Sequence, residues 1–145
     1  MMKVTGARDL QRALDRMARE VAEPIAERAM LAGAKPVEDE ARRKVPRRTG
    51  EGAAAIERAV DPTRKAGGPM RVLVGPSAGT KASRRDGFYL RFVELGTGPR
   101  HTDDGAHRGS ITRDPFLRPA LDAKAGEVIR ITRRELARGI EDASR

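Results

Sequence analysis

The sequence of 145 residues contains no cysteine and no tryptophan, and aromatic residues make up only 3% of it. Without cysteine the protein has no disulfide framework and no thiolate that binds a metal, and a cytosolic environment is compatible with its composition. Because aromatic residues are so few, we expect a core built mainly from Ala, Val, Leu and Ile.

Long apolar runs are also missing. No stretch approaches the roughly 18 apolar residues of a membrane span. The first nine residues, Met-Met-Lys-Val-Thr-Gly-Ala-Arg-Asp, contain no apolar segment of signal-peptide length. We therefore expect no membrane partner.

Sequence motifs of catalysis and cofactor binding are absent as well. Gly67 and Gly68 are followed by Pro69 instead of the Lys-Ser/Thr pair of a phosphate loop, and no serine lies in a nucleophile elbow. We therefore predict that the protein is not an enzyme and uses no cofactor.

Charge is abundant, with 30 Lys and Arg residues against 21 Asp and Glu and a formal net charge of +9. The two signs are interleaved, and no block of five or six like charges occurs. One interpretation is a solvated, Arg-rich surface. The other is a protein that works close to DNA without reading its sequence.

Leu10, Leu14, Met17 and Val21 are spaced by four, three and four, which predicts an amphipathic helix. Pro24 interrupts this pattern, being best tolerated in the first turn of a following helix, and the pattern resumes from Ile25 to Ala41. Pro36 lies inside this run and predicts either a kinked long helix or a break near Lys35. The residue before a proline is pushed out of the helical region, so the helix is expected to end at Val45-Pro46.

The remaining pattern predicts an α+β fold in a single domain, residues 1–145. Strands are expected at Ile56–Val60, Met70–Gly75 and Phe88–Leu95, paired in a small antiparallel sheet that packs against the long N-terminal helix and a C-terminal helix. The C-terminal helix starts at Pro115. The loops at about 76–87 and 98–114 are long for so small a domain and are expected to be mobile. The apolar stripe of the C-terminal helix consists of Leu117, Leu121, Val128, Ile129, Leu136 and Ile140.

The stretch Phe88–Thr97 holds three of the four aromatic residues. Side chains alternate between the two faces of a strand, so one face of this stretch is predicted to meet the core. The second face is also apolar and is expected to be covered by the chain's own helices or by a neighbouring chain. The predicted core residues are Phe88, Leu90, Phe92, Phe116 and Leu117, and the predicted subunit-interface residues are Tyr89, Arg91, Val93, Leu95 and Thr97.

Glu94 lies on the face predicted to be buried, where a lone carboxylate requires a cationic or backbone partner. Arg118, Arg71 or an arginine of another subunit are the candidates. We predict that Glu94 and Arg118 form a structural latch. A catalytic role would require a second acid or a histidine nearby, and nothing in the sequence places one there.

The segment His101–His107 holds two imidazoles and two carboxylates, a set of ligands that zinc or manganese accepts. A metal-dependent hydrolase using His101, Asp103 and His107 is therefore one reading of this segment. Because no fixed ligand spacing supports it, we favour a polar, mobile loop and predict no metal site.

Three motifs occur in a characteristic order: Val-Pro-Arg-Arg-Thr-Gly at 45–50, Tyr-Leu-Arg-Phe-Val-Glu-Leu-Gly-Thr at 89–97 and Pro-Phe-Leu-Arg-Pro-Ala at 115–120. A Val-Leu-Val-Gly strand lies between the first two. From about Val37 to Ile140, this order closely resembles the tail-component family of long-tailed bacteriophages, the tail-completion, neck or minor tail protein Z type. The sequence departs from the family pattern with Gly52 in place of Leu and Ala55 in place of Ser.

The resemblance implies a virion structural protein made in the bacterial cytoplasm and located in the tail or neck. Such proteins resemble small subunits that form rings, commonly hexamers, at the head–tail junction, with head connector or stopper and tail terminator or tail-tube proteins as partners. Genomic DNA would pass through the ring without base-specific contacts. The alternative is a free, non-specific nucleic-acid-binding module. The candidates for residues along the DNA path are Arg47, Arg48, Arg84 and Arg85.

Overall fold

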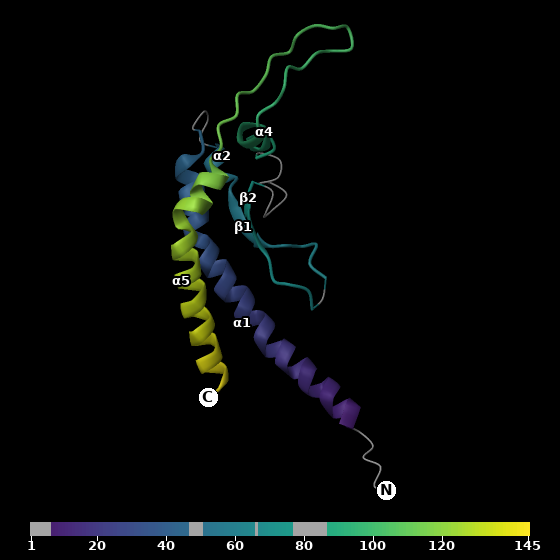
Figure 1. Cartoon of the computed structure of the whole chain (residues 1–145), viewed down its shortest axis with the longest axis vertical. Helices are drawn as coiled ribbons and strands as arrows, with labels where there is room; N and C mark the ends of the chain where they lie inside the picture. Colours follow the sequence, from purple (N-terminus) through teal and green to yellow (C-terminus); the bar gives the residue numbers. More distant parts are fainter. Residues whose placement is uncertain (1–6, 47–50, 66, 77–86) are drawn as a thin grey trace.

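The computed structural model describes residues 7–46, 51–65, 67–76 and 87–145. Its longest elements are two helices, α1 (Ala7–Lys44) and α5 (Leu117–Ala143), which lie side by side (Figure 1). Between them in the chain come α2 (Glu51–Ala54), β1 (Glu57–Val60), β2 (Val72–Gly75) and α4 (Leu90–Leu95). The predicted α+β class, with a small antiparallel sheet against two helices, is confirmed.

Helix α1 runs without a break through Pro24 and Pro36, so of the two alternatives the structure has the continuous helix. Its axis bends part-way along (Figure 1), as proline in a helix interior predicts. The helix ends at Lys44, directly before Val45 and Pro46, as expected. Packing against the rest of the fold compensates for the backbone hydrogen bonds that the two prolines cannot donate.

The two long helices pack antiparallel and very closely. Gly33 of α1 faces Thr132 of α5, and Gly139 of α5 faces Ile25 of α1. A β-carbon added to either glycine would overlap the side chain opposite it. The close approach of α1 and α5 therefore depends on the absence of a side chain at these two positions.

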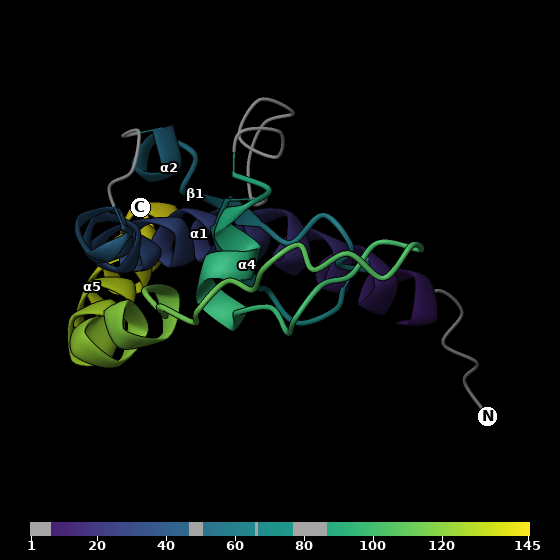
Figure 2. The ribbon, with the colours of Figure 1, turned by 90° about the horizontal axis from the view of Figure 1, so that it is seen from above.

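In the part of the chain that the structure describes, the sheet has two strands. β1 and β2 pair antiparallel, with Glu57 opposite Gly75 and Val60 opposite Val72, and they pack on α1 (Figures 1 and 2). The two strands predicted first along the chain are therefore present and paired as expected.

The third predicted strand is wrong, because Phe88–Leu95 forms a turn and the short helix α4. Gly96, at φ +73°, ends the helix, and its N–H donates to the carbonyl oxygen of Phe92 at 2.8 Å. In a helix, alternate residues do not share a face. Leu90 is buried, but Phe88 is 62% exposed, so its assignment to the core is also wrong.

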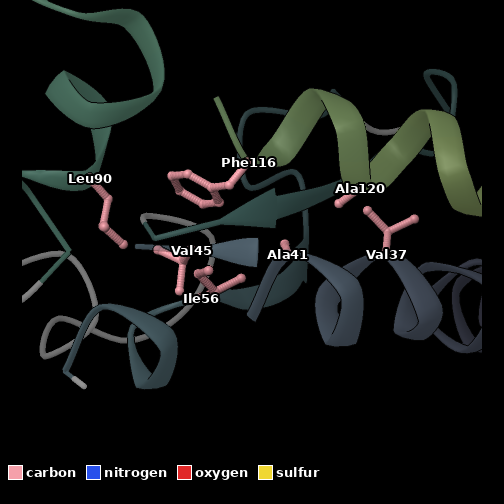
Figure 3. Packing of buried hydrophobic residues seen from close by; sticks show 7 residues of the cluster. All are labelled: Val37, Ala41, Val45, Ile56, Leu90, Phe116 and Ala120. Carbon is pink, nitrogen blue, oxygen red and sulfur yellow. The ribbon is translucent and has the colours of Figure 1, made fainter. Parts of the chain in front are cut away.

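The core lies where α1, β1, α4 and α5 meet (Figure 3). Its largest fully buried side chains are Phe116, Ile56 and Leu90, which come from three separate parts of the chain. Leu117 is partly buried and packs against the same cluster. The remaining members are smaller, as the shortage of aromatic residues predicts: Val37, Ala41, Val45 and Ala120.

Residues 97–113, here called the arm, form a hydrogen-bonded ribbon that projects from the end of the fold near α4 (Figure 1). Backbone bonds join Thr97 to Ile111 and Arg100 to Gly109, and a turn closes at Gly105, whose φ is +80°. The predicted loop at 98–114 is therefore a paired ribbon. Most of the other predicted loop, residues 77–86, lies outside the described residues.

Candidate functional site

Glu94 holds the start of α5. One carboxylate oxygen accepts hydrogen bonds from the backbone N–H groups of Phe116 at 2.7 Å and Leu117 at 3.0 Å, and the other accepts from that of Arg118 at 3.3 Å. These N–H groups begin a helix and have no partner within it. A carboxylate at this position also interacts favourably with the helix dipole.

The latch predicted between Glu94 and Arg118 therefore uses the backbone of Arg118. The guanidinium Nε of Arg118 instead donates to Asp122 one turn along α5, at 3.1 Å. The sequence predicts that Glu94 needs a cationic or backbone partner, but it does not show which one. The N–H groups that Glu94 binds lie more than twenty residues away in the chain.

The five predicted interface residues do not form one face. Tyr89 and Val93 pack against the core, whereas Arg91 is exposed and Leu95 is 63% exposed. Thr97 lies at the base of the arm, where its hydroxyl accepts from the N–H of Ile111 at 2.9 Å. Within this set, Arg91 and Leu95 alone are open to a neighbouring molecule.

An apolar groove, here called the groove, follows the boundary between β2 and the two long helices. Its volume is about 760 Å³, and its walls include Met30 of α1, Val72 of β2 and Leu121 of α5. A second hollow of about 320 Å³ continues it past Val74 and Leu117 towards α4. Several wall residues remain open to solvent, which is unusual for large apolar side chains that line one continuous surface. The most exposed of them are Leu73 at 44%, Leu121 at 47%, Ile129 at 53% and Leu95 at 63%.

The outer edge of β2 borders this groove. The N–H of Asp61 donates to the carbonyl of Arg71 at 3.0 Å, which fixes which cross-strand pairs are hydrogen-bonded. In that register the N–H and C=O groups of Val72 and Val74 point away from β1. No further strand pairs with β2 in the described part of the chain, so these groups form a free sheet edge.

A buried carboxylate that the sequence did not reveal lies at Glu38, which is 4% exposed. Glu38 forms ion pairs with Arg42 at 2.6 Å and with Arg58 of β1. Arg42 also donates to the carbonyl of Ile56 at 2.8 Å. Two guanidinium groups compensate the charge of Glu38, so this cluster joins α1 to the strand.

The histidines of the arm face each other across the ribbon. Their rings are 5.2 Å apart in an edge-to-face arrangement, and Nδ1 of His107 accepts from the N–H of Gly109 at 3.1 Å. Over the described residues, no group of three or more His, Cys, Asp or Glu side chains is placed to hold a metal ion. Asp103 therefore does not join the two histidines in a metal-binding cluster.

The four arginines predicted along a DNA path, at positions 47, 48, 84 and 85, lie outside the described residues. None of the helices that the structure describes combines the length and apolarity required to cross a bilayer.

Residues 8–96 match the model of a protein family described as "Bacteriophage HK97-gp10, putative tail-component". That range covers more than half of the chain. The chain belongs to this family of phage tail components. No curated protein and no solved structure matches it.

Membership of the tail-component family agrees with the resemblance carried by the sequence motifs. Within the matched range, Gly52 of α2 is buried, and a β-carbon there would lie 2.7 Å from the hydroxyl of Tyr89 and 3.2 Å from Leu90. A larger side chain at this position would displace Tyr89 or Leu90. The absence of a side chain at Gly52 therefore permits the close packing of α2 against α4.

Proposed function

We propose that this tail component is a structural subunit of a ring, most simply a hexamer, at the head–tail junction of a long-tailed phage or phage-like particle, through which DNA passes. Its neighbours in the particle are head connector or stopper proteins on one side and tail terminator or tail-tube proteins on the other. The role is structural and involves no catalysis.

The observation that supports this proposal is the amount of surface that the subunit leaves uncovered. Among the described residues, seven large apolar side chains are 44% exposed or more, including Leu73 of β2 and Leu121 and Ile129 of α5. Exposed apolar side chains that line one continuous groove are typical of a protein–protein interface. A ring supplies such interfaces, because each subunit meets one neighbour with one surface and the other neighbour with a different surface.

The groove and the free edge of β2 are the surface we assign to one side of that contact. An apolar groove beside unpaired backbone groups favours a neighbour that covers both. A free nucleic-acid-binding module would gain nothing from an apolar surface of this kind, since DNA binding depends on basic side chains.

Electron microscopy of purified particles tests the position of the chain. We expect a ring of its density between the head and the tail, and native mass spectrometry of the purified chain or of the neck complex should give one copy number. Particles that lack the chain should accumulate as full heads and separate tails. Density elsewhere in the particle, or none, would contradict the proposed position.

A point substitution tests the groove. Ile129→Glu places a charge on a half-exposed wall residue, so the subunit should fold normally while the ring population falls roughly tenfold or more. Ala125→Glu, on an exposed part of α5 outside the groove, is the matched control and should assemble normally. Equal assembly of the two variants would remove the groove from the interface.

A further inference from the structure

The arm carries two arginines and two histidines, and each kind has one member on each strand of the ribbon. Arg108 donates its N–H to the carbonyl of Arg100 at 2.7 Å, and Arg100 donates to that of Gly109 at 3.1 Å. The next pair along the ribbon is His101 and His107, which form a bridge. His101 and His107 are directly opposite and share a face of the ribbon. Arg100 faces Arg108 and Gly109 together, so the ribbon is bulged at this point and the two arginines lie across from each other.

The two arginines have no counter-charge. Both are exposed, and among the residues that the structure describes no carboxylate forms an ion pair with either of them. The acids Asp103 and Asp104 lie in the turn, three and four residue steps along the ribbon from Arg100. Three steps amount to about 10 Å, which is close to the distance over which physiological salt screens exposed charges.

Like charges that lie across a ribbon from each other destabilise it. The arm has little apolar packing to offset this effect, since Ile111 is the one large aliphatic side chain in residues 97–113. The arrangement therefore favours an anionic partner from outside the chain. The arm also lies beyond residues 8–96, the part that matches the family model.

We propose that the arm binds the phosphate backbone of double-stranded DNA, with Arg100 and Arg108 as the contact residues. Guanidinium groups match phosphate oxygens in geometry as well as charge. A two-stranded ribbon has the width that the major groove admits, and the formal net charge of +9 attracts DNA to the whole subunit. The inference rests on the proposed function in one respect, namely that DNA passes the ring.

The test measures binding of the full chain to a linear duplex of mixed sequence, by fluorescence anisotropy over a series of salt concentrations. Each phosphate contact contributes about 0.9 to the slope of log affinity against log salt, so Arg100→Ala with Arg108→Ala should reduce the slope by about 1.8. Affinity at about 0.1 M salt should fall roughly tenfold or more. Arg100→Lys with Arg108→Lys keeps the charge and should retain most of the slope.

Arg130→Ala with Arg138→Ala is the matched control, because it removes the same charge from exposed positions on α5. Its effect on the slope should be clearly smaller.

Equal losses in the two double variants would show that DNA binding responds to net charge alone and would overturn the proposal. Unchanged DNA binding with lost binding to the neighbouring neck or tail proteins would make the arm a protein contact. If the chain forms no ring but the arm variant still loses more DNA binding than the control, the proposed ring is contradicted and the proposed role of the arm is supported.

Discussion

The core around Phe116 and the arm that precedes it are adjacent in the chain but are held together by different forces. In the core, side chains from α1, α4, α5 and the segments beside them bury apolar surface, and the residues that meet are far apart in the sequence. In the arm, backbone hydrogen bonds join residues at most fourteen positions apart, and most side chains are exposed. Folding therefore depends on the core, whereas the arm is available for contact with other molecules.

The largest effect that separates the two regions is expected from Phe116→Ala. Because this ring is fully buried, its removal should lower the free energy of unfolding by about 3–5 kcal/mol. Ile111→Ala in the arm removes a half-exposed side chain and should cost about 1 kcal/mol or less. Urea denaturation of both variants measures the difference, and similar losses would mean that the arm belongs to the core.

The link between the regions is tested by Glu94→Ala. The substitution leaves the first N–H groups of α5 without their acceptor and should cost about 1–3 kcal/mol. Asp122→Ala is the control, since it breaks only an exposed ion pair with Arg118 and should cost below about 1 kcal/mol. Thermal unfolding followed by circular dichroism measures both. If the two variants unfold alike, the latch contributes nothing to stability.

The dependence of the helix pair on small residues is tested by Gly139→Ala. The new methyl group would overlap Ile25, so α1 and α5 must separate, at a cost of about 1–3 kcal/mol that helix propensity offsets only in part. Gly126→Ala on the same helix meets no neighbour and should stabilise the protein by about 0.5–1 kcal/mol. The opposite signs make the pair a sharp test, and a stabilising Gly139→Ala would contradict the close packing described here.

The smallest effect concerns acid stability at the end of β1. The side-chain hydroxyl of Thr63, at 2.7 Å, and its backbone N–H, at 2.9 Å, hold the pKa of Asp61 below its ordinary value of 3.8. A lowered pKa in the folded state contributes stability above the unfolded value, and this contribution disappears as the pH falls through the folded value. Thr63→Ala should therefore raise the pKa of Asp61 and weaken the pH dependence of stability in this range. An NMR titration of Asp61 that is identical in the variant would refute the assignment.

The elements predicted correctly are those in which the local sequence and the tertiary contacts favour the same structure. Helix α1 ends at Val45-Pro46 because proline restricts the residue before it, which no tertiary contact reverses. Strand β2 follows from the short apolar run Val72–Val74, and a turn rich in Gly and Pro separates it from β1. The α+β class follows directly from these elements.

The stretch Phe88–Leu95 was predicted wrongly because its pattern fits two periods. Phe88, Leu90 and Phe92 alternate as in a strand, but Tyr89 and Val93 lie four positions apart, as they do on one face of a helix. Tertiary contacts decide between the periods: Leu90 enters the core, and Tyr89 meets α2 at Gly52. Neither contact can be read from a run of eight residues.

The candidate site was predicted only in part. Glu94 was identified as a latch from its apolar neighbours, although its actual partners are backbone amides of a distant helix start. The groove was not predicted, because it is formed by α1, β2 and α5 together, and none of these alone has an unusual sequence. The same reason applies to Glu38, whose burial depends on Arg58 from another element.

The two ends of the arm are fastened to the same short helix. Asp114 donates its N–H to the carbonyl of Val93 at 2.9 Å, and Glu94 holds the residues that follow, while Gly96 closes the helix on the other side. A mechanical load on the ribbon, such as a passing or pressurised genome would exert, is therefore transmitted through α4 to the beginning of α5. A force applied to the arm therefore reaches the Glu94 carboxylate first. That carboxylate is hydrogen-bonded to the backbone of Phe116, whose side chain is fully buried in the core.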